Sequence, residues 1–488
     1  MNTIITINYK DKKEALPAKS GESFLDILQR YSYPIPAPCG GLGKCGKCKI
    51  QIISGRYTGP DPDKDNMVLA CRTYPISNCE IKLPTHDGIG LTSFTGTIIK
   101  SDNISGFGAA LDVGTTTLAL ALVELDTGRI IRTASTLNPQ HAFGADVISR
   151  INACRDKLTI KIQQQSVLNA ANNLLKKTSQ GIHISHLTVA GNTTMLHLFC
   201  GEDPTGMGIS PFTPVFTDIR HYSGRQLGLD VENVTILPSV SAYIGSDVTA
   251  GILSCNLEQK NALLLDLGTN GELALSSNGK LICASTAAGP AFEGAGIECG
   301  IGGVDGAINH IWLVDNELKY STIGDTTAKG ICGSGLIDLI ALMIKTEAID
   351  ETGAMDYSNS LISDEGRLNI TDRVYLTQND VRAFQLAKSA ICSGILTLLQ
   401  NTTIPDEIML AGALGFYINT ENALACGILP PSLDMKLYAV GNSALLGGCM
   451  ALYPSSLNKL AQLANRCEVI DLSANSYFSE QFIENMYF

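Results

Sequence analysis

The stretch LDVGTTTLALALVEL, residues 111–125, decides the fold because it recurs in outline as LDLGTNGELALSS at residues 265–277. Each segment places an apolar run, an aspartate, a glycine and a threonine before a polar turn and a second apolar strand. A single turn of this kind is often a plain β-turn. Two copies on matching hairpins instead predict two similarly built lobes.

Each hairpin carries the groups of one half of a polyphosphate clamp. A glycine in the turn lets backbone N–H groups approach a phosphate, threonine hydroxyls add donors, and an aspartate holds Mg²⁺ directly or through water. We therefore expect catalytic roles for Asp112 and Asp266, and for Glu272, which could orient an attacking water or be a solvated turn residue. The predicted nucleotide contacts here are Gly114, Thr115, Thr116, Gly268, Thr269 and Asn270.

The composition is that of a compact globular chain. Its 488 residues are enough for two or three domains, and the net charge of −12 argues against general affinity for nucleic acid or anionic lipid. The sequence contains no run of about 18 apolar residues and no signal peptide pattern, so we expect no membrane contact and a cytoplasmic location. The 15 cysteines, mostly scattered singly, suit a reducing compartment.

A glycine-rich loop, PCGGLGKCGKC at residues 38–48, carries three cysteines, and Cys71 follows in MVLACR. The spacing C-x5-C-x2-C-x22-C lets thiolates converge on one inorganic centre, and the glycines permit backbone angles that turn amides toward sulfur. Structural zinc usually needs two CxxC units and a redox dithiol needs a CxxC that opens a helix, so both are less favoured. Cys79 is an alternative fourth ligand, although it lies in an apparent strand.

This cysteine spacing resembles that of vertebrate-type and bacterial adrenodoxin-like [2Fe-2S] ferredoxins. The resemblance also covers the alternating strands at residues 3–9 and 48–59 and the helical spacing at 24–33. It implies a β-grasp fold that holds a [2Fe-2S] cluster. The implied ligands are Cys39, Cys45, Cys48 and Cys71.

The two hairpins are similar to those of the acetate and sugar kinase, Hsp70 and actin superfamily, whose two ribonuclease H-like lobes close on ATP. That resemblance implies ATP and Mg²⁺ as cofactors. EIMLAGALGFYINTENAL, residues 407–424, resembles the adenosine-contacting motif and implicates Gly412 and Ala413. GICGSGLIDLIALM, residues 330–343, resembles a connecting segment between lobes and implicates Gly333 and Ser334, although simple helix packing explains its glycines equally well.

The predicted fold is an α+β N-terminal [2Fe-2S] ferredoxin-like (β-grasp) domain followed by an α/β two-lobed ribonuclease H-like ATPase. Turn residues dominate at residues 86–108, which predicts a connection there. The expected limits are 1–88 for the ferredoxin-like domain, 89–105 for a linker, 106–260 for the first ATPase lobe and 261–488 for the second.

Over nearly the whole chain, this combination resembles the reductive activators of corrinoid enzymes. The resemblance rests on the cysteine pattern and on LDVGTTT, LTVAGNTTM, LLLDLGTNGE, GPAFEGA, GICGSGLID and AGALG. It implies an ATP-hydrolysing activase that delivers one electron from its cluster to a corrinoid protein or corrinoid iron-sulfur protein, converting inactive Co(II) to Co(I). An upstream electron donor is also implied. Driving an electron uphill costs roughly 2.3 kcal/mol per 100 mV, which an ATP-coupled change can supply.

Other functions stay open at this stage. A redox-sensing ATPase or chaperone-like binding module would use the cluster as a switch, and a small-molecule kinase would phosphorylate a metabolite. Activators of radical dehydratases share the lobe plan but bridge two subunits with their cluster. LDVGTTT begins only 40 residues after Cys71, which predicts that the middle domain of longer activators is missing, and with it the basis for modelling a homodimer on them.

Overall fold

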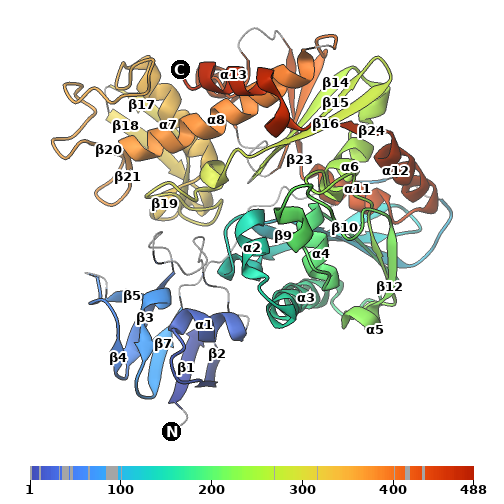
Figure 1. Cartoon of the computed structure of the whole chain (residues 1–488), viewed down its shortest axis with the longest axis horizontal. Coiled ribbons are helices and arrows are strands. Elements are labelled where there is room, and N and C mark those ends of the chain that lie inside the picture. The colour runs from blue at the N-terminus through green and yellow to red at the C-terminus, as the bar shows by residue number, and fades with distance from the viewer. Residues whose placement is uncertain are drawn as a thin grey trace.

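A computed structural model places most of the chain. It describes residues 3–9, 12–31, 33, 35, 43, 48–63, 66–83, 97–99, 102–268, 270–315, 317–400, 402–412, 418–430 and 435–488. Figure 1 shows a small β-rich unit at the N-terminal end and two larger sheet-containing lobes. None of the helices in these described ranges is long and apolar enough to cross a membrane.

The N-terminal unit is a five-stranded sheet in the order β2-β1-β7-β3-β5, with a helix, α1, packed against it. The first strand is an inner strand of the sheet, antiparallel to β2 and parallel to β7, as in a β-grasp fold. Ser23 and Asp26 form a capping box that starts α1, and its apolar face is buried. The elements are β1 (Thr3–Tyr9), β2 (Lys12–Ala18), α1 (Phe24–Arg30), β3 (Lys49–Ser54), β4 (Tyr57–Thr58), β5 (Met67–Leu69), η1 (Ala70–Arg72), β6 (Tyr74–Pro75) and β7 (Cys79–Lys82).

The first lobe is built on a six-stranded sheet in the order β10-β9-β8-β11-β13-β12. The long helix α3 packs against β9 and β10. The strands are β8 (Phe107–Val113), β9 (Thr117–Glu124), β10 (Arg129–Leu137), β11 (His186–Gly191), β12 (Arg220–Ser223) and β13 (Asn233–Ile236). The helices are η2 (Pro139–Ala142), α2 (Val147–Ala153), α3 (Lys157–Ser179), α4 (Thr193–Cys200), η3 (Thr205–Gly208), α5 (Gly224–Leu227), α6 (Ser246–Ser254) and η4 (Leu257–Gln259).

The second lobe has a six-stranded sheet in the order β23-β22-β14-β15-β16-β24 and a smaller sheet, β18-β17-β19. Its strands are β14 (Ala262–Leu267), β15 (Gly271–Ser277), β16 (Lys280–Thr286), β17 (Ala307–Val314), β18 (Glu317–Thr322), β19 (Gly330–Ile331), β20 (Arg367–Asn369), β21 (Tyr375–Thr377), β22 (Glu407–Ala411), β23 (Lys436–Gly441) and β24 (Cys467–Val469). Its helices are η5 (Pro290–Glu293), η6 (Ile323–Asp325), α7 (Gly333–Lys345), α8 (Gln378–Leu399), α10 (Thr420–Ala425), α11 (Ser443–Met450), α12 (Pro454–Arg466), η7 (Leu472–Ala474) and α13 (Ser476–Glu484).

The two main sheets share one plan. In each, three consecutive strands form an antiparallel meander, β8-β9-β10 or β14-β15-β16. Two further strands, β11 and β13 or β22 and β23, then extend the sheet parallel to the first strand of the meander. This repeated arrangement is the ribonuclease H-like lobe, so the predicted fold class is confirmed.

Helices α6 and α11 join the lobes, and they lie side by side between the two sheets (Figure 1). Side chains of α6 belong to a core shared with β14 and β15, whereas α11 packs on β8 and β9 of the first lobe. Their contact depends on small residues, because a Cβ added at Gly447 would lie 2.0 Å from the carbonyl oxygen of Ala250. The crossing therefore brings the two backbones together and fixes how the lobes face each other.

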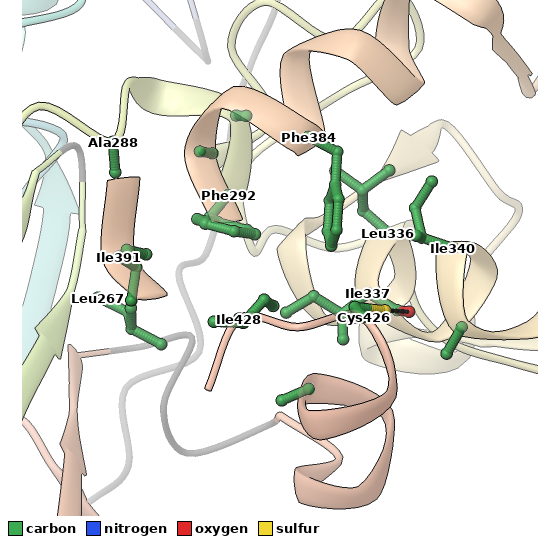
Figure 2. Packing of buried hydrophobic residues seen from close by; sticks show 14 of the residues in the cluster. Leu267, Ala288, Phe292, Leu336, Ile337, Ile340, Phe384, Ile391, Cys426 and Ile428 are labelled. Atoms are coloured by element: carbon green, nitrogen blue, oxygen red, sulfur yellow. Dashed lines mark hydrogen bonds between the residues drawn. The ribbon is translucent and has the colours of Figure 1, made fainter. Parts of the chain in front are cut away.

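The largest apolar core lies beneath the cleft in the second lobe and is formed largely by α7, α8 and η5. Figure 2 shows Phe292 and Phe384 pointing toward each other there, with ring centroids 5.5 Å apart in an edge-to-face arrangement. Phe292 is 3% exposed and also lines the cleft. The cleft wall is thus held by a closely packed interior, which resists deformation.

Candidate functional site

The first hairpin brings its polar groups to the edge of the β8–β9 ladder. Asp112 stands opposite Ala119, and the turn closes with a hydrogen bond of 3.0 Å from the Gly114 amide to the carbonyl of Thr117. A Cβ at Gly114 would lie 2.7 Å from that carbonyl, so only glycine fits this turn without a shift. Asp112 therefore projects into the cleft directly before a tight turn.

The second hairpin repeats this geometry in the other lobe. Asp266 stands opposite Glu272 across β14 and β15, and the Gly268 amide donates to the carbonyl of Asn270 at 3.0 Å. Gly412 follows the parallel strand β22 with a φ of +83°, and a Cβ there would lie 2.7 Å from Oδ1 of Asp266. Glycine is required at this position both for the backbone angle and for space.

A cavity of about 230 Å³ lies between the two hairpins. The predicted residues that line it are Asp112, Gly114, Thr115, Thr116, Asp266, Gly268, Asn270, Glu272, Gly333, Ser334 and Gly412. Thr269 and Ala413 lie outside the described residues. The structure thus brings together, from both lobes, every predicted nucleotide residue that it describes.

Two asparagines that the sequence analysis missed hold the first hairpin in place. Asn192 Nδ2 donates to Thr115 Oγ1 at 3.0 Å, and Asn442 Nδ2 donates to Asp112 Oδ2 at 2.8 Å. Each also caps a helix, since its Oδ1 accepts from the backbone of Met195 or Leu445. A sequence signal for both exists: an apolar strand followed by Gly-Asn and then Thr or Ser, as in VAGNTT and VGNSAL.

The cleft concentrates negative charge. Asp247 at the start of α6 and Glu293 at the end of η5 also line it, which adds two carboxylates that the sequence did not single out. Among the described residues that line the cavity, none is a lysine or an arginine. The described lining thus contributes acidic but no basic side chains to the cleft, and we expect a bound cation to be favoured there.

Burial and the crowding of these carboxyl groups raise their pKa values. Burial raises the pKa of Asp112 to about 7, although the Asn442 amide opposes the rise and Asp247 adds to it. Burial raises the pKa of Asp266 to about 7, and the charges of Asp247 and Asp112 add to the shift. The pKa of Asp247 rises to about 6, again through burial. Burial also raises the pKa of Glu272.

The described residues contain no group of three or more histidine, cysteine or acidic side chains arranged to hold a metal ion. Mg²⁺ keeps several waters and is usually held by one or two carboxylates together with substrate phosphates. The arrangement of Asp112 and Asp266 on opposite sides of one cavity suits an ion that arrives with a nucleotide.

The N-terminal unit brings together two of the predicted cluster ligands. The Sγ atoms of Cys48 and Cys71 lie 3.3 Å apart, and both side chains are buried. Cys39 and Cys45 lie outside the described residues. Two thiols this close and shielded from water suit a shared inorganic centre.

Cys79 is placed differently from that pair. Its Sγ donates to the carbonyls of Ser77 at 3.2 Å and Arg56 at 3.4 Å, and it sits at the start of strand β7. Burial raises the pKa of its thiol. A buried thiol that donates to two carbonyls is a structural group, which disfavours Cys79 as a fourth ligand.

Comparisons with known proteins agree with this architecture. A family described as the 2Fe-2S iron-sulfur cluster binding domain matches residues 7–75, one described as the RACo middle region matches 107–260, and one described as the C-terminal domain of RACo, the ASKHA domain, matches 260–488. The expectation that a middle domain is missing was therefore wrong. A segment of that description is present, within the stretch that the sequence analysis assigned to the first ATPase lobe.

Individual relatives of the chain agree with these family matches. The chain is 32% identical to the corrinoid activation enzyme RamQ of Eubacterium limosum, over 78% of this chain and 70% of the relative. It is 25% identical to the [Co(II) methylated amine-specific corrinoid protein] reductase of Methanosarcina barkeri, over 74% and 72%. The solved structure of a reductive activator for corrinoid, iron-sulfur protein matches with a TM-score of 0.71 at 26% identity, covering 99% of this chain and 98% of that one.

Fold and site together define a two-lobed ATPase of the sugar kinase, Hsp70 and actin class, joined to a [2Fe-2S] ferredoxin-like domain. More narrowly, the chain belongs to the family of reductive activators of corrinoid proteins.

Proposed function

We propose that this chain uses ATP to drive the reductive activation of a corrinoid protein, converting inactive Co(II) to Co(I). The observation that carries the proposal is the union, in one chain of this family, of a [2Fe-2S] domain and an ATPase whose cleft collects carboxylates from both lobes. An ATPase alone needs no electron carrier, and an electron carrier alone needs no ATP. Their union supplies both the electron and the free energy to move it uphill.

We assign the nucleotide to the cleft between the hairpins. Asp112 and Asp266 hold its Mg²⁺, directly or through water, while the turns at Gly114–Thr116 and Gly268–Asn270 donate to its phosphates. Glu272 orients the attacking water. The N-terminus of α7 at Gly333 and Ser334, and the loop at Gly412 and Ala413, surround the rest of the nucleotide.

Charge allows the nucleotide to favour one arrangement of the two lobes. Besides burial, the charges of Asp247 and Asp112 in the first lobe raise the pKa of Asp266 in the second, so the ionised carboxylates of the two lobes repel each other. Asp112 and Asp266 would both hold a metal only when the two hairpins face it, and that arrangement would relieve the repulsion. Nucleotide binding therefore favours one arrangement of the lobes by its differential affinity for that arrangement.

We assign the cluster to Cys39, Cys45, Cys48 and Cys71, of which the described pair Cys48 and Cys71 has the required proximity. When bound, the cluster supplies the single electron that cobalt receives. The protein shields the thiols of Cys48 and Cys71 from water, and a low-dielectric environment of this kind tunes the reduction potential of a cluster. The domain limits that we propose remain 1–88, 89–105, 106–260 and 261–488.

The corrinoid protein is the partner that we propose for the reduced chain. A separate electron donor must reload the cluster after each turnover, because one cluster stores one electron. A homodimer is the assembly that the family resemblance suggests, and light scattering of the purified chain tests it.

The deciding experiment mixes the reduced chain, Mg-ATP and a Co(II) corrinoid protein, and follows cobalt by absorbance. We expect Co(I) to appear only with all three components. The Asp266→Asn variant should keep its cluster spectrum but fail to support the conversion. Nucleotide turnover that responds to cluster oxidation, with no corrinoid reduced by any partner tested, would instead indicate a redox-sensing ATPase or a chaperone-like binding module.

A further inference from the structure

The ferredoxin-like domain contacts the first lobe through residues 138–150, here called the coupling segment. Ala142 and Phe143, 1% and 7% exposed, belong to the same apolar cluster as α1 and Cys71. In addition, Gln29 Nε2 of α1 donates to the carbonyl oxygen of Ala142. The middle of the coupling segment is thus part of the core of the cluster-binding domain.

The start of the coupling segment holds the first phosphate hairpin. Asn138 is fully buried, its Nδ2 donates to the carbonyl of Gly114 at 2.8 Å, and its backbone amide donates to the carbonyl of Thr116 at 2.8 Å. Its Oδ1 accepts from the Gln140 amide at 3.0 Å and so starts η2. Because both bonds go to the backbone of the turn, the turn cannot shift without moving η2 or breaking buried hydrogen bonds.

Arg150 of α2 ties the coupling segment to the same turn a second time. Its guanidinium is fully buried, with Nη2 donating to the carbonyl of Thr115 and Nε donating to the carbonyl of Gly144 at 3.0 Å. The backbone of the first hairpin turn is therefore bonded at three consecutive residues, 114–116, by side chains or backbone of one short segment.

The contacts continue from α1 to the region of the cluster. The backbone amide of Phe24, at the start of α1, donates to the carbonyl of Thr73 at 2.9 Å. Thr73 follows the short 3₁₀ turn that contains Cys71, and its Oγ1 donates back to the carbonyl of Leu69 at 2.9 Å. Hydrogen bonds and packing contacts thus link the phosphate hairpin, η2, α1 and the Cys71 turn without a break.

We propose that residues 138–150 couple nucleotide occupancy of the cleft to the docking of the ferredoxin-like domain. Asn138 is the positioning residue on the nucleotide side of this route, and Gln29 of α1 is the positioning residue on the ferredoxin-like side. The inference rests on the proposed function for the nucleotide site and adds the route between the two halves. Packed side chains and hydrogen bonds that have two discrete arrangements can carry such a coupling, and its measure is a coupling free energy.

Coupling between two sites is reciprocal, which makes the proposal testable without a corrinoid protein. If Mg-ATP tightens docking of the domain, then docking must tighten binding of Mg-ATP by the same factor. The variant Gln29→Glu keeps the size of the side chain but replaces the amide donor with a carboxylate facing a carbonyl. It changes a residue of the ferredoxin-like domain, outside the residues that line the nucleotide cavity.

The first experiment measures Mg-ATP affinity by calorimetry and hydrogen exchange of the α1 amides by mass spectrometry. We expect Mg-ATP to slow exchange in α1 of the native chain, and Gln29→Glu to abolish that effect while weakening nucleotide binding about fivefold, within the usual range of allosteric coupling. Retained visible absorption by the cluster shows that the variant domain is folded. Gln165→Glu, an exposed position on α3, is the matched control and should change neither readout.

The second experiment is a double-mutant cycle on Mg-ATP affinity with Gln29→Glu and Asn138→Ala. Non-additive effects are expected, because either change breaks the same route. Additive effects, or native affinity and native exchange in Gln29→Glu, would overturn the proposal. If Asn138→Ala melts the first lobe, Phe143→Leu takes its place in the cycle. Failure of the proposed function looks different, since Mg-ATP would then bind with coupling intact while cobalt stays Co(II).

Discussion

The side-chain amide of Asn442 donates to Oδ2 of Asp112 over 2.8 Å, although 330 positions separate the two residues in the chain. Oδ1 of the same asparagine accepts from the Leu445 amide at 2.7 Å and caps α11. One side chain thus starts a helix between the lobes and orients a carboxylate in the cleft. The position of α11 and the electrostatics of the site are therefore linked.

Substitutions at Asn442 should separate its two roles. Asn442→Ala removes both the cap and the bond to Asp112, and loss of a cap costs about 1 kcal/mol of folding free energy. Asn442→Ser keeps a capping oxygen but not the amide donor. We expect both variants to weaken Mg-ATP binding, measured by calorimetry, and only the alanine variant to lose stability in urea unfolding. Equal loss of stability in both would contradict this division.

The cleft carboxylates should make the chain without nucleotide less stable as pH rises. The folded pKa of Asp266 is raised to about 7, whereas an unfolded aspartate titrates near 3.9. The folded state therefore holds more protons between these values, and the free energy of unfolding should fall as pH rises from about 4 to about 7. Asp266→Asn should flatten that slope in melting curves recorded without metal or nucleotide.

The same carboxylates should make metal-nucleotide binding depend on pH in the opposite direction. Protonated Asp112 and Asp266 cannot attract a cation, so affinity for Mg-ATP should fall as pH drops below about 7. Calorimetric titrations at a series of pH values check this. Affinity that does not change between pH 8 and pH 5, once the protonation of the terminal phosphate of ATP in that range is subtracted, would argue against both residues as metal-binding groups.

Gly447 should be intolerant of any side chain. An added Cβ would lie 2.0 Å from the carbonyl oxygen of Ala250, so Gly447→Ala must push α11 away from α6. Overpacking of this kind typically costs about 1–3 kcal/mol, visible in urea unfolding. Gly302→Ala is the control, because an added Cβ there meets nothing within 4 Å. Equal stability of the two variants would mean that the helices separate without cost.

Two of the buried cysteines of the N-terminal unit, Cys71 and Cys79, should respond differently to substitution. Cys71→Ser removes a thiol that lies 3.3 Å from Cys48 Sγ and should bleach the visible absorption of the cluster. Cys79→Ser keeps a donor for the carbonyls of Ser77 and Arg56 and should retain the spectrum. Iron analysis of both purified variants provides the second readout. A bleached Cys79→Ser protein with normal Cys71→Ser would reassign the fourth ligand.

His197 should contribute a separate acid sensitivity to the first lobe. It is fully buried, Nδ1 lies 2.7 Å from the Thr193 carbonyl that it donates to, and Nε2 accepts from the Val215 amide at 2.9 Å, so the ring is neutral. Burial lowers its pKa below 6.5. The unfolded chain then binds the proton more readily, and stability should fall as pH drops below about 6.5. His197→Gln should reduce this loss in melting curves, whereas the exposed His183→Gln should not.

Much of the site could be predicted from local sequence. The repeat of Asp-x-Gly-Thr at residues 112–115 and 266–269 identified both hairpins, because a tight turn that leaves its amides free needs glycine and polar neighbours in consecutive positions. The other contributors gave weaker signals. Asn192 and Asn442 each follow an apolar strand and a glycine, but no local pattern says that they and Asp247 meet at the cleft, where parallel strands end and interlobe helices begin.

By itself, the sequence determined the elements and their chemistry. The cysteine loop and the two clamps follow from the spacing of a few consecutive residues, and the ribonuclease H-like lobes were implied by the resemblance of those hairpins to a known superfamily. Only the tertiary structure decided how these parts act on one another. In the folded chain, Asn442 donates a hydrogen bond to Asp112, and α6 packs closely on α11 at Gly447. Gln29 of the N-terminal domain donates to the carbonyl oxygen of Ala142, in the segment that holds the phosphate hairpin. Such contacts join distant segments through packing and burial, and those forces depend on the folded arrangement rather than on neighbours in the chain.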